Sequence, residues 1–247
     1  MKTLKYYAAI VCFCILTSGI AQTKTLVKSF NKVVISPHIE AILVEGNEEA
    51  VTIKENTETN DKVNIEVKGK TLRIYLDDAK ETTKTETIIK NGTKQSVPIY
   101  NGKVLTVEVS YKTLETLSVR GEQSTVCESK IEQEDFNLKI YGESQITLKE
   151  IELEYLQVVI YGESDFTVAF GSVNDQKITA YGESVVNLLN AENKTSKLRA
   201  YGEAEFKINA SEKIKITAYG DASLQHKGNA SVSKGIAIGD VDISRVN

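Results

Sequence analysis

The chain has 247 residues and a formal net charge of −4, from 30 Lys and Arg and 34 Asp and Glu. This balance is not typical of nucleic-acid-binding proteins, which usually carry a basic patch, so we expect no nucleic-acid partner. The two histidines, His38 and His226, argue against a multi-histidine metal site, and we expect both at the surface or in turns.

The first residues are typical of a secretory signal peptide. Lys2 and Lys5 supply positive charge, residues 6–16 form an apolar run too short to span a bilayer well, and Gly19 and Ala21 are the small residues that a signal peptidase requires. The sequence therefore predicts a signal peptide over residues 1–21 and a mature chain, residues 22–247, that forms a single domain. No later stretch predicts a transmembrane segment.

The first part of the mature chain predicts less regular strands. Residues 33–44 alternate between apolar and polar, with a corner at Ser36-Pro37. Further short strands are predicted at residues 51–53, 63–67, 72–76 and 104–109. Between them, residues 77–96 are rich in Thr, Lys and Glu, which predicts an exposed excursion with a hairpin that turns at Asn91-Gly92.

A four-residue motif, typically Tyr-Gly-Glu-Ser, recurs along the rest of the chain. Its copies begin at Arg120, Tyr141, Tyr161, Tyr181, Tyr201, Tyr219 and Ile238, so that consecutive copies are 18 to 21 residues apart. A nearly constant period indicates a repeat architecture, in which each unit buries its apolar face against its neighbours. We expect regular repeats over residues 114–247.

Every second residue around the motif is apolar or small, which is the pattern of a β-strand with one buried face. Around Tyr161 this inward set is Val158, Ile160, Gly162, Ser164, Phe166 and Val168. Gly and Ser or Ala are thus predicted to face inward at a sharp bend, with Tyr and Glu pointing outward. Strands that follow a full circuit run parallel, with right-handed crossovers. The sequence predicts an all-β fold, a right-handed parallel β-helix (β-solenoid) with rungs of about 20 residues.

Cys127 is the one cysteine that remains after removal of residues 1–21, so no intrachain disulfide can form. Its sequence neighbours include no histidine, which favours a buried free thiol over a nucleophile. The first copy of the motif departs by one residue. This predicts a β-bulge near Gln123 and leaves open which face Cys127 lies on.

Several stretches together resemble one known family. They are Phe30-Asn-Lys-Val-Val-Ile-Ser, Ile42-Leu-Val-Glu-Gly, Leu114-Glu-Thr-Leu-Ser-Val and the repeated Gly-Glu/Asp-Ser/Ala corners. Over most of the mature chain they resemble the "putative auto-transporter adhesin, head GIN domain" family, which is common in Bacteroidota. The resemblance implies a β-helical fold and a secreted, periplasmic or outer-membrane-associated location in a Gram-negative cell envelope. It implies no catalytic residues.

Stacked rungs would place the outward residues of the motif in vertical files. We expect these files to bind a ligand through Tyr141, Glu143, Tyr161, Glu163, Tyr181, Glu183, Tyr201, Glu203, Tyr219 and Asp221. Aromatic faces can stack on sugar rings, and carboxylates accept hydrogen bonds from hydroxyls. The files therefore favour an exported binding or adhesion-type module whose partner is a glycan or a cell-surface protein, although repetition alone would also produce them.

A row of carboxylates also suits a hard cation. Two unit charges about 5 Å apart repel by about 0.8 kcal/mol in water, and a divalent cation would relieve this repulsion. The sequence therefore predicts weak Ca²⁺ binding at Glu143, Glu163, Glu183 and Glu203 and no other cofactor.

The alternative function is a polysaccharide-degrading enzyme, pectate-lyase-like or a glycosidase, on the same scaffold. Carboxylates about 5 Å apart match the separation in retaining glycosidases, and Lys139, Arg199 and Arg120 are candidates for a basic group. Repetition gives the carboxylates similar surroundings, however, whereas a general acid and a nucleophile need different ones. We therefore expect a protein that is not an enzyme. Open strand edges at the ends of the stack favour a homodimer.

Overall fold

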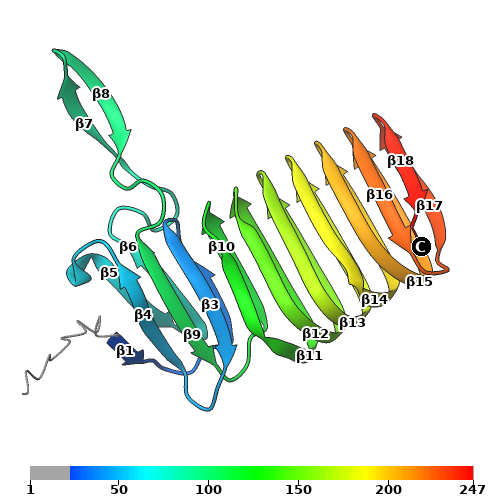
Figure 1. The fold of residues 1–247 in the computed structure, drawn as a ribbon, viewed down its shortest axis with the longest axis horizontal. Helices are drawn as coiled ribbons and strands as arrows, with labels where there is room; N and C mark the ends of the chain where they lie inside the picture. Colours follow the sequence, from blue (N-terminus) through cyan, green and yellow to red (C-terminus); the bar gives the residue numbers. More distant parts are fainter. Residues whose placement is uncertain (1–22, 247) are drawn as a thin grey trace, which may run out of the picture.

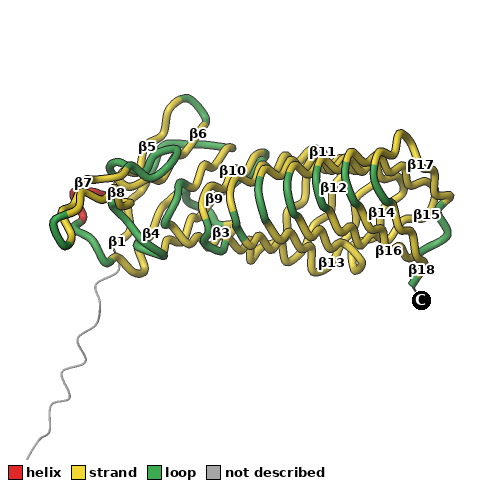
Figure 2. Tube along the Cα trace, turned by 90° about the horizontal axis from the view of Figure 1, so that it is seen from above, coloured by secondary structure: helices red, strands yellow, loops and turns green. Residues whose placement is uncertain are grey.

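The computed structural model describes residues 23–246, so the predicted signal peptide lies outside the described residues. Within them the chain winds into a row of stacked rungs, with the N-terminal strands at one end and the C-terminus at the other (Figures 1 and 2). Neighbouring rungs pair in parallel, and Tyr141, Tyr161 and Tyr181 are direct partners. The predicted β-solenoid with a repeat of about 20 residues is confirmed.

Nine strands build the regular part of the coil. They are β10 (Thr116–Gly121), β11 (Thr125–Gly142), β12 (Gln145–Tyr161), β13 (Ser164–Tyr181), β14 (Ser184–Tyr201), β15 (Ala204–Tyr219), β16 (Ala222–Lys227), β17 (Ser231–Ile238) and β18 (Val241–Arg245). Strands β11 to β15 each run through almost a whole rung, and the motif forms the turn between one of them and the next.

The inward side chains form one continuous core along the axis of the coil. Ile160 and Phe166 are fully buried, whereas Tyr161 and Glu163 between them are exposed, as the alternation predicts. Phe136 and Phe206 are also among the largest fully buried side chains. Each such side chain contributes about 1.5–3 kcal/mol of hydrophobic stabilisation, which a single rung could not obtain alone.

The glycines of the motif lie at partly exposed corners, not at the inward positions that the alternation predicts. Gly142 has a φ of +112° and Gly162 a φ of +121°, values that residues with a side chain rarely adopt. An ideal Cβ on Gly162 would lie 2.3 Å from the carbonyl oxygen of Gly142 in the preceding rung. Glycine is therefore required by the turn and by the close approach of two backbones, not by a narrow space in the core.

The β-bulge also lies elsewhere than predicted. The register between β11 and β12 is constant from Thr125 to Cys127 and shifts between Cys127 and Lys130, so the irregularity is not near Gln123. Cys127 precedes the shift and is a fully buried free thiol, as expected. Its Sγ lies 3.3 Å from the hydroxyl of Tyr111, and burial raises the pKa of the thiol to about 11.

The N-terminal strands form the first rungs and cover the end of the coil. β2 (Lys32–Ile35) and β3 (Ile39–Glu45) lie on either side of the predicted corner at Ser36-Pro37 and pair in parallel with β10 and β11. The other strands are β1 (Thr23–Leu26), β4 (Ala50–Asn56), β5 (Val63–Lys68), β6 (Thr71–Leu76) and β9 (Leu105–Tyr111), with a short 3-10 helix at Asn60–Lys62. β4 pairs antiparallel with β9, and β5 with β6, which ends the parallel stack.

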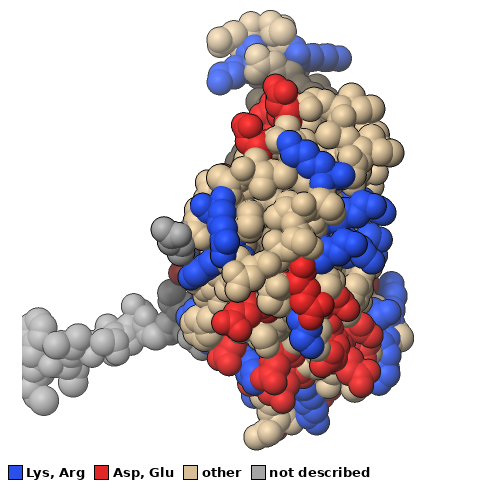
Figure 3. Space-filling model, turned by 90° about the vertical axis from the view of Figure 1, so that its right-hand side faces the viewer, with Lys and Arg blue, Asp and Glu red and all other residues tan. Residues whose placement is uncertain are grey.

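The predicted hairpin is present and forms an arm, residues 85–98, composed of β7 (Thr85–Lys90) and β8 (Thr93–Pro98). It turns at Asn91 and Gly92, whose φ values of +51° and +76° are those of a type I′ turn. The arm is a separate two-stranded sheet that projects from the N-terminal end of the coil (Figure 1). Its side chains are almost all exposed. On the face of the body at the C-terminal end, many of the Asp and Glu side chains gather in the lower part of the view (Figure 3).

The C-terminal end of the coil carries cations in the files that apolar residues occupy elsewhere. Lys234 is the direct partner of the buried Ile216, and Arg245 that of His226. Lys234 Nζ donates a hydrogen bond to the carbonyl oxygen of Val241 at 2.8 Å. Charged side chains at an exposed edge oppose pairing with another chain; the homodimer expected from the open strand edges stays a prediction.

The two histidines differ from each other. His38 lies at the corner after Pro37 with a φ of +69°, as expected for a turn residue. His226 is not at the surface: its side chain faces inward and the residue is 8% exposed. Burial, and to a smaller extent the charge of Arg245, lowers its pKa. None of the described residues belongs to a helix that is long and apolar enough to cross a membrane.

Candidate functional site

Five tyrosines form a stacked file, here called the tyrosine file, where strands β11 to β15 end. Its members are Tyr141, Tyr161, Tyr181, Tyr201 and Tyr219, in direct register. Neighbouring ring centroids are 5.2, 4.8, 4.7 and 5.1 Å apart, and the ring planes lie within 10° of parallel. Each pair contributes about 0.5–1.5 kcal/mol beyond burial. The file therefore stabilises the coil while its last four members stay 36–43% exposed.

The stacking leaves ring edges and hydroxyl groups open to a ligand, but not ring faces. Each inner ring has another ring over both faces. At one end the guanidinium of Arg120 lies 4.5 Å from the ring centroid of Tyr141, and at the other end Ile238 is the direct partner of Tyr219. A sugar ring therefore cannot stack on these faces, contrary to the expectation from the sequence. Ring edges carry partial positive charge, and the hydroxyls donate and accept hydrogen bonds.

The carboxylates of the motif form a second file, the carboxylate file, two residues after the tyrosines. It contains Glu143, Glu163, Glu183, Glu203 and Asp221, all exposed. Backbone hydrogen bonds continue through the turns; the N–H of Ser184 donates to the carbonyl of Glu203 at 3.0 Å. Among the described residues no ion pair involves these five side chains. The file thus keeps its negative charge uncompensated.

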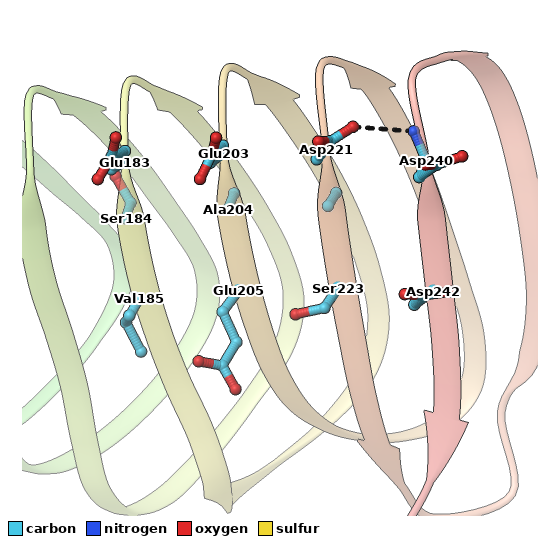
Figure 4. A pocket seen from close by; sticks show the side chains of 11 residues that line it. Glu183, Ser184, Val185, Glu203, Ala204, Glu205, Asp221, Ser223, Asp240 and Asp242 are labelled. Atoms are coloured by element: carbon cyan, nitrogen blue, oxygen red, sulfur yellow. Dashed lines mark hydrogen bonds between the residues drawn. The ribbon is translucent and has the colours of Figure 1, made fainter.

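The carboxylate file is one wall of a groove, here called the corner groove. Two adjoining depressions of about 330 and 490 Å³ follow the turns and share Glu183, Ser184 and Val185. The other wall consists of outward residues two positions further along, some of them visible in Figure 4: Gln145, Asp165, Val185, Glu205, Ser223 and Asp242. This second wall was not among the predicted site residues. The sequence could have identified this wall, because residues two apart in a strand lie on the same face: Asp165 and Glu205 point to the same side as Glu163 and Glu203.

Buried serines hold the turns that carry these side chains. Ser144 Oγ donates to the carbonyl of Gly121 at 2.7 Å, and Ser164 Oγ donates to that of Gly142 at 2.8 Å. A buried hydroxyl without a partner would be costly, so these bonds explain why the inward position after Glu accepts a polar residue. Each bond joins one turn to the preceding rung and so fixes the position of the neighbouring carboxylate.

The described residues contain no preformed metal site, because no group of three or more His, Cys, Asp or Glu side chains lies close enough together to hold an ion. Ca²⁺ takes about six to eight oxygen ligands, whereas the carboxylate file offers one carboxylate per rung. Calcium binding at Glu143, Glu163, Glu183 and Glu203 stays a prediction, and it would require water to supply most of the ligands.

The basic candidates for catalysis lie apart from the carboxylates. Lys139 in β11 and Arg199 in β14 point outward, two residues before the tyrosines of these strands. Arg120 forms an ion pair with Glu81 at 2.9 Å in addition to its contact with Tyr141. None of these three residues lines the corner groove.

Comparison with known proteins gives a family and several solved structures. The family described as "Putative auto-transporter adhesin, head GIN domain" matches residues 29–230. A "putative adhesin" from Bacteroides fragilis is 18% identical, with a TM-score of 0.74 over 91% of this chain and 96% of that chain. A "Putative lipid binding protein" from Parabacteroides distasonis is 17% identical, with a TM-score of 0.65 over 92% of this chain and 96% of that chain.

A third structure, a "putative adhesin" from Parabacteroides merdae, is 14% identical, with a TM-score of 0.64 over 92% of this chain and 96% of that chain. At these identities the three structures show that the fold is shared. No curated protein sequence matches the chain.

Proposed function

Because the chain belongs to the "Putative auto-transporter adhesin, head GIN domain" family, we propose that it is an exported binding module of the adhesin type. Its place would be the cell surface or another compartment of the envelope, as the names and bacterial sources of its structural relatives suggest. Its binding surface would be the strip made of the tyrosine file and the corner groove.

One observation carries this proposal: five carboxylates that have no cationic partner in the described part of the chain lie in register beside an exposed file of stacked tyrosines. Some acidic side chains elsewhere on the described surface are paired with cations; Lys130, for example, forms ion pairs with both Glu132 and Glu152. Like charges on neighbouring strands repel by about 0.8 kcal/mol per pair in water. A ligand that donates hydrogen bonds or carries positive charge would relieve this repulsion on binding.

The spacing favours a linear ligand laid along the axis of the coil. Rungs are about 4.8 Å apart, and each one offers a tyrosine hydroxyl, a ring edge and a carboxylate. An extended glycan could donate its hydroxyls to this row, and an extended segment of a cell-surface protein could donate N–H groups or basic side chains. Both partners fit the polar chemistry, and neither needs access to a ring face.

The test removes the polar groups without disturbing the stack. Glu183→Gln combined with Glu203→Gln removes two charges, and Tyr161→Phe combined with Tyr181→Phe removes two hydroxyls. Binding is screened on a glycan array and on solubilised cell-surface proteins, and affinities for the hits are then measured. We expect the Gln pair to weaken binding at least about tenfold, which corresponds to about 1.4 kcal/mol. Glu134→Gln, which removes an exposed acid outside the strip, is the matched control.

Affinities equal to that of the unmodified chain in both double variants would show that the strip is not the site. Affinities and thermal melting midpoints measured in CaCl₂ and in EDTA test the predicted calcium binding. If both are unchanged, calcium binding at the carboxylate file is excluded. Release of reducing ends from polygalacturonate would instead support the enzyme alternative. We expect none, because the carboxylates share one environment and no pair is differentiated into acid and nucleophile.

A further inference from the structure

The arm, residues 85–98, pairs with no other strand of the described chain. An isolated two-stranded hairpin is marginally stable at best in water, and three or more strands are needed for independent stability. The arm also exposes Ile88 and Ile89, which are 36% and 72% accessible. It therefore has apolar side chains and free strand edges for which a single copy of the protein provides no partner.

The turn decides which backbone groups of β7 are free. In a type I′ turn the carbonyl of the first residue, here Lys90, accepts a hydrogen bond from the N–H of the fourth, here Thr93. Along an antiparallel strand the backbone groups of alternate residues point to opposite edges. Those of Lys90, Ile88 and Glu86 thus point toward β8, and those of Thr85, Thr87 and Ile89 point to the outer edge.

We propose that β7 pairs antiparallel with β7 of a second copy of the chain, giving a four-stranded sheet across a two-fold axis. The free backbone groups can meet only when odd-numbered residues face odd-numbered residues. A register centred on Ile88 meets this condition, because Thr87 then exchanges hydrogen bonds with Ile89 of the second copy. In the same register Ile88 faces Ile88 of the second copy.

The side chains match in this register as well. Glu86, Ile88 and Lys90 lie on one face of the strand, and Glu86 faces Lys90 of the second copy. Two-fold symmetry repeats each contact, so the interface has two opposite-charge pairs flanking an isoleucine pair. Neither Glu86 nor Lys90 has an ion-pair partner within one copy among the described residues.

Two other edges, the outer edge of β8 and the C-terminal end of the coil, are less suited to this pairing. On β8, Pro98 removes an N–H from the outer edge and Lys94 adds charge beside it. At the C-terminal end of the coil, Lys234 and Arg245 point into the file positions of the core. β7 carries no proline, and its charges are self-complementary.

The first experiment blocks one edge at a time. Thr87→Pro removes an N–H that the arm itself does not use, so it leaves the hairpin bonded but closes the outer edge of β7. Ser96→Pro is the matched control, because Ser96 faces Thr87 in the arm and its N–H points to the outer edge of β8. Sedimentation of the mature chain over a concentration series should give a dimer for the unmodified chain and for Ser96→Pro. Thr87→Pro should sediment as a monomer.

The second experiment exchanges the charges. Glu86→Lys and Lys90→Glu each place like charges opposite each other, and each should weaken the dimer at least about tenfold. A one-to-one mixture of these two variants restores both opposite-charge pairs and should dimerise, as should a chain that carries both changes. An unmodified chain that stays monomeric up to about 1 mM, or a dimer insensitive to Thr87→Pro, would overturn the proposal. Failure of the mixture to associate would overturn the register.

Discussion

Replacing Gly162 by alanine should damage the coil at its most constrained point. The φ of +121° lies in a region that is essentially restricted to glycine, and holding an alanine there costs about 1–3 kcal/mol. The new Cβ would also lie 2.3 Å from the carbonyl oxygen of Gly142, and the rungs would have to separate locally, at a further cost of about 1–3 kcal/mol. We expect Gly162→Ala to lower the free energy of unfolding by about 2–6 kcal/mol.

The matched control is Gly69→Ala. Gly69 also has a positive φ, +61°, but an added Cβ would meet no atom within 4 Å, so only the backbone cost of about 1–2 kcal/mol applies. Urea denaturation followed by circular dichroism gives both losses, and the slope of each transition reports whether a coil of repeats still unfolds in one step. Equal losses for the two variants would refute the argument that two backbones approach too closely for a side chain.

The two remaining predictions concern the C-terminal rungs. The lowered pKa of His226 means that the unfolded chain binds a proton more readily than the folded chain below about pH 6.5. Its contribution to stability is therefore complete above that pH and is lost as the pH falls below it, so His226→Leu should flatten the dependence of the melting midpoint between about pH 7 and 5; an unchanged slope would contradict this. Lys234→Ile combined with Arg245→Leu should create an apolar, open end that associates end to end, detectable by light scattering; a variant that stays as monodisperse as its parent would show that these cations do not protect the end.

Much of the fold follows from local patterns. The 20-residue period of the motif and the alternation around Tyr161 predict stacked parallel strands, because the period-2 direction of side chains belongs to each strand by itself. The files of tyrosines and carboxylates follow from the same two patterns, since equal steps along the chain bring equal positions together. The turn at Asn91-Gly92 could be predicted for a similar reason: its chemistry is contained in two adjacent residues.

The errors of prediction all involve contacts between segments that are distant in sequence. The alternation of inward and outward residues places Gly162 inside the coil. In the structure it lies at a corner, where the backbone of the preceding rung leaves no room for a Cβ. The irregularity after Cys127 depends on how β11 fits against its neighbours. His226 looks like a surface residue until the stack places it above Ile208.

The sequence by itself determined the repeat, the strand class and the outward direction of the tyrosines and carboxylates of the motif, because those properties depend on steps of two residues and of about 20. Only the tertiary structure decided that neighbouring rings cover one another's faces and that, within residues 23–246, the carboxylates have no cationic partner. These properties depend on the distances between rungs and, in the described chain, on the absence of cationic side chains near the carboxylates. The local order of amino acids specifies neither of them.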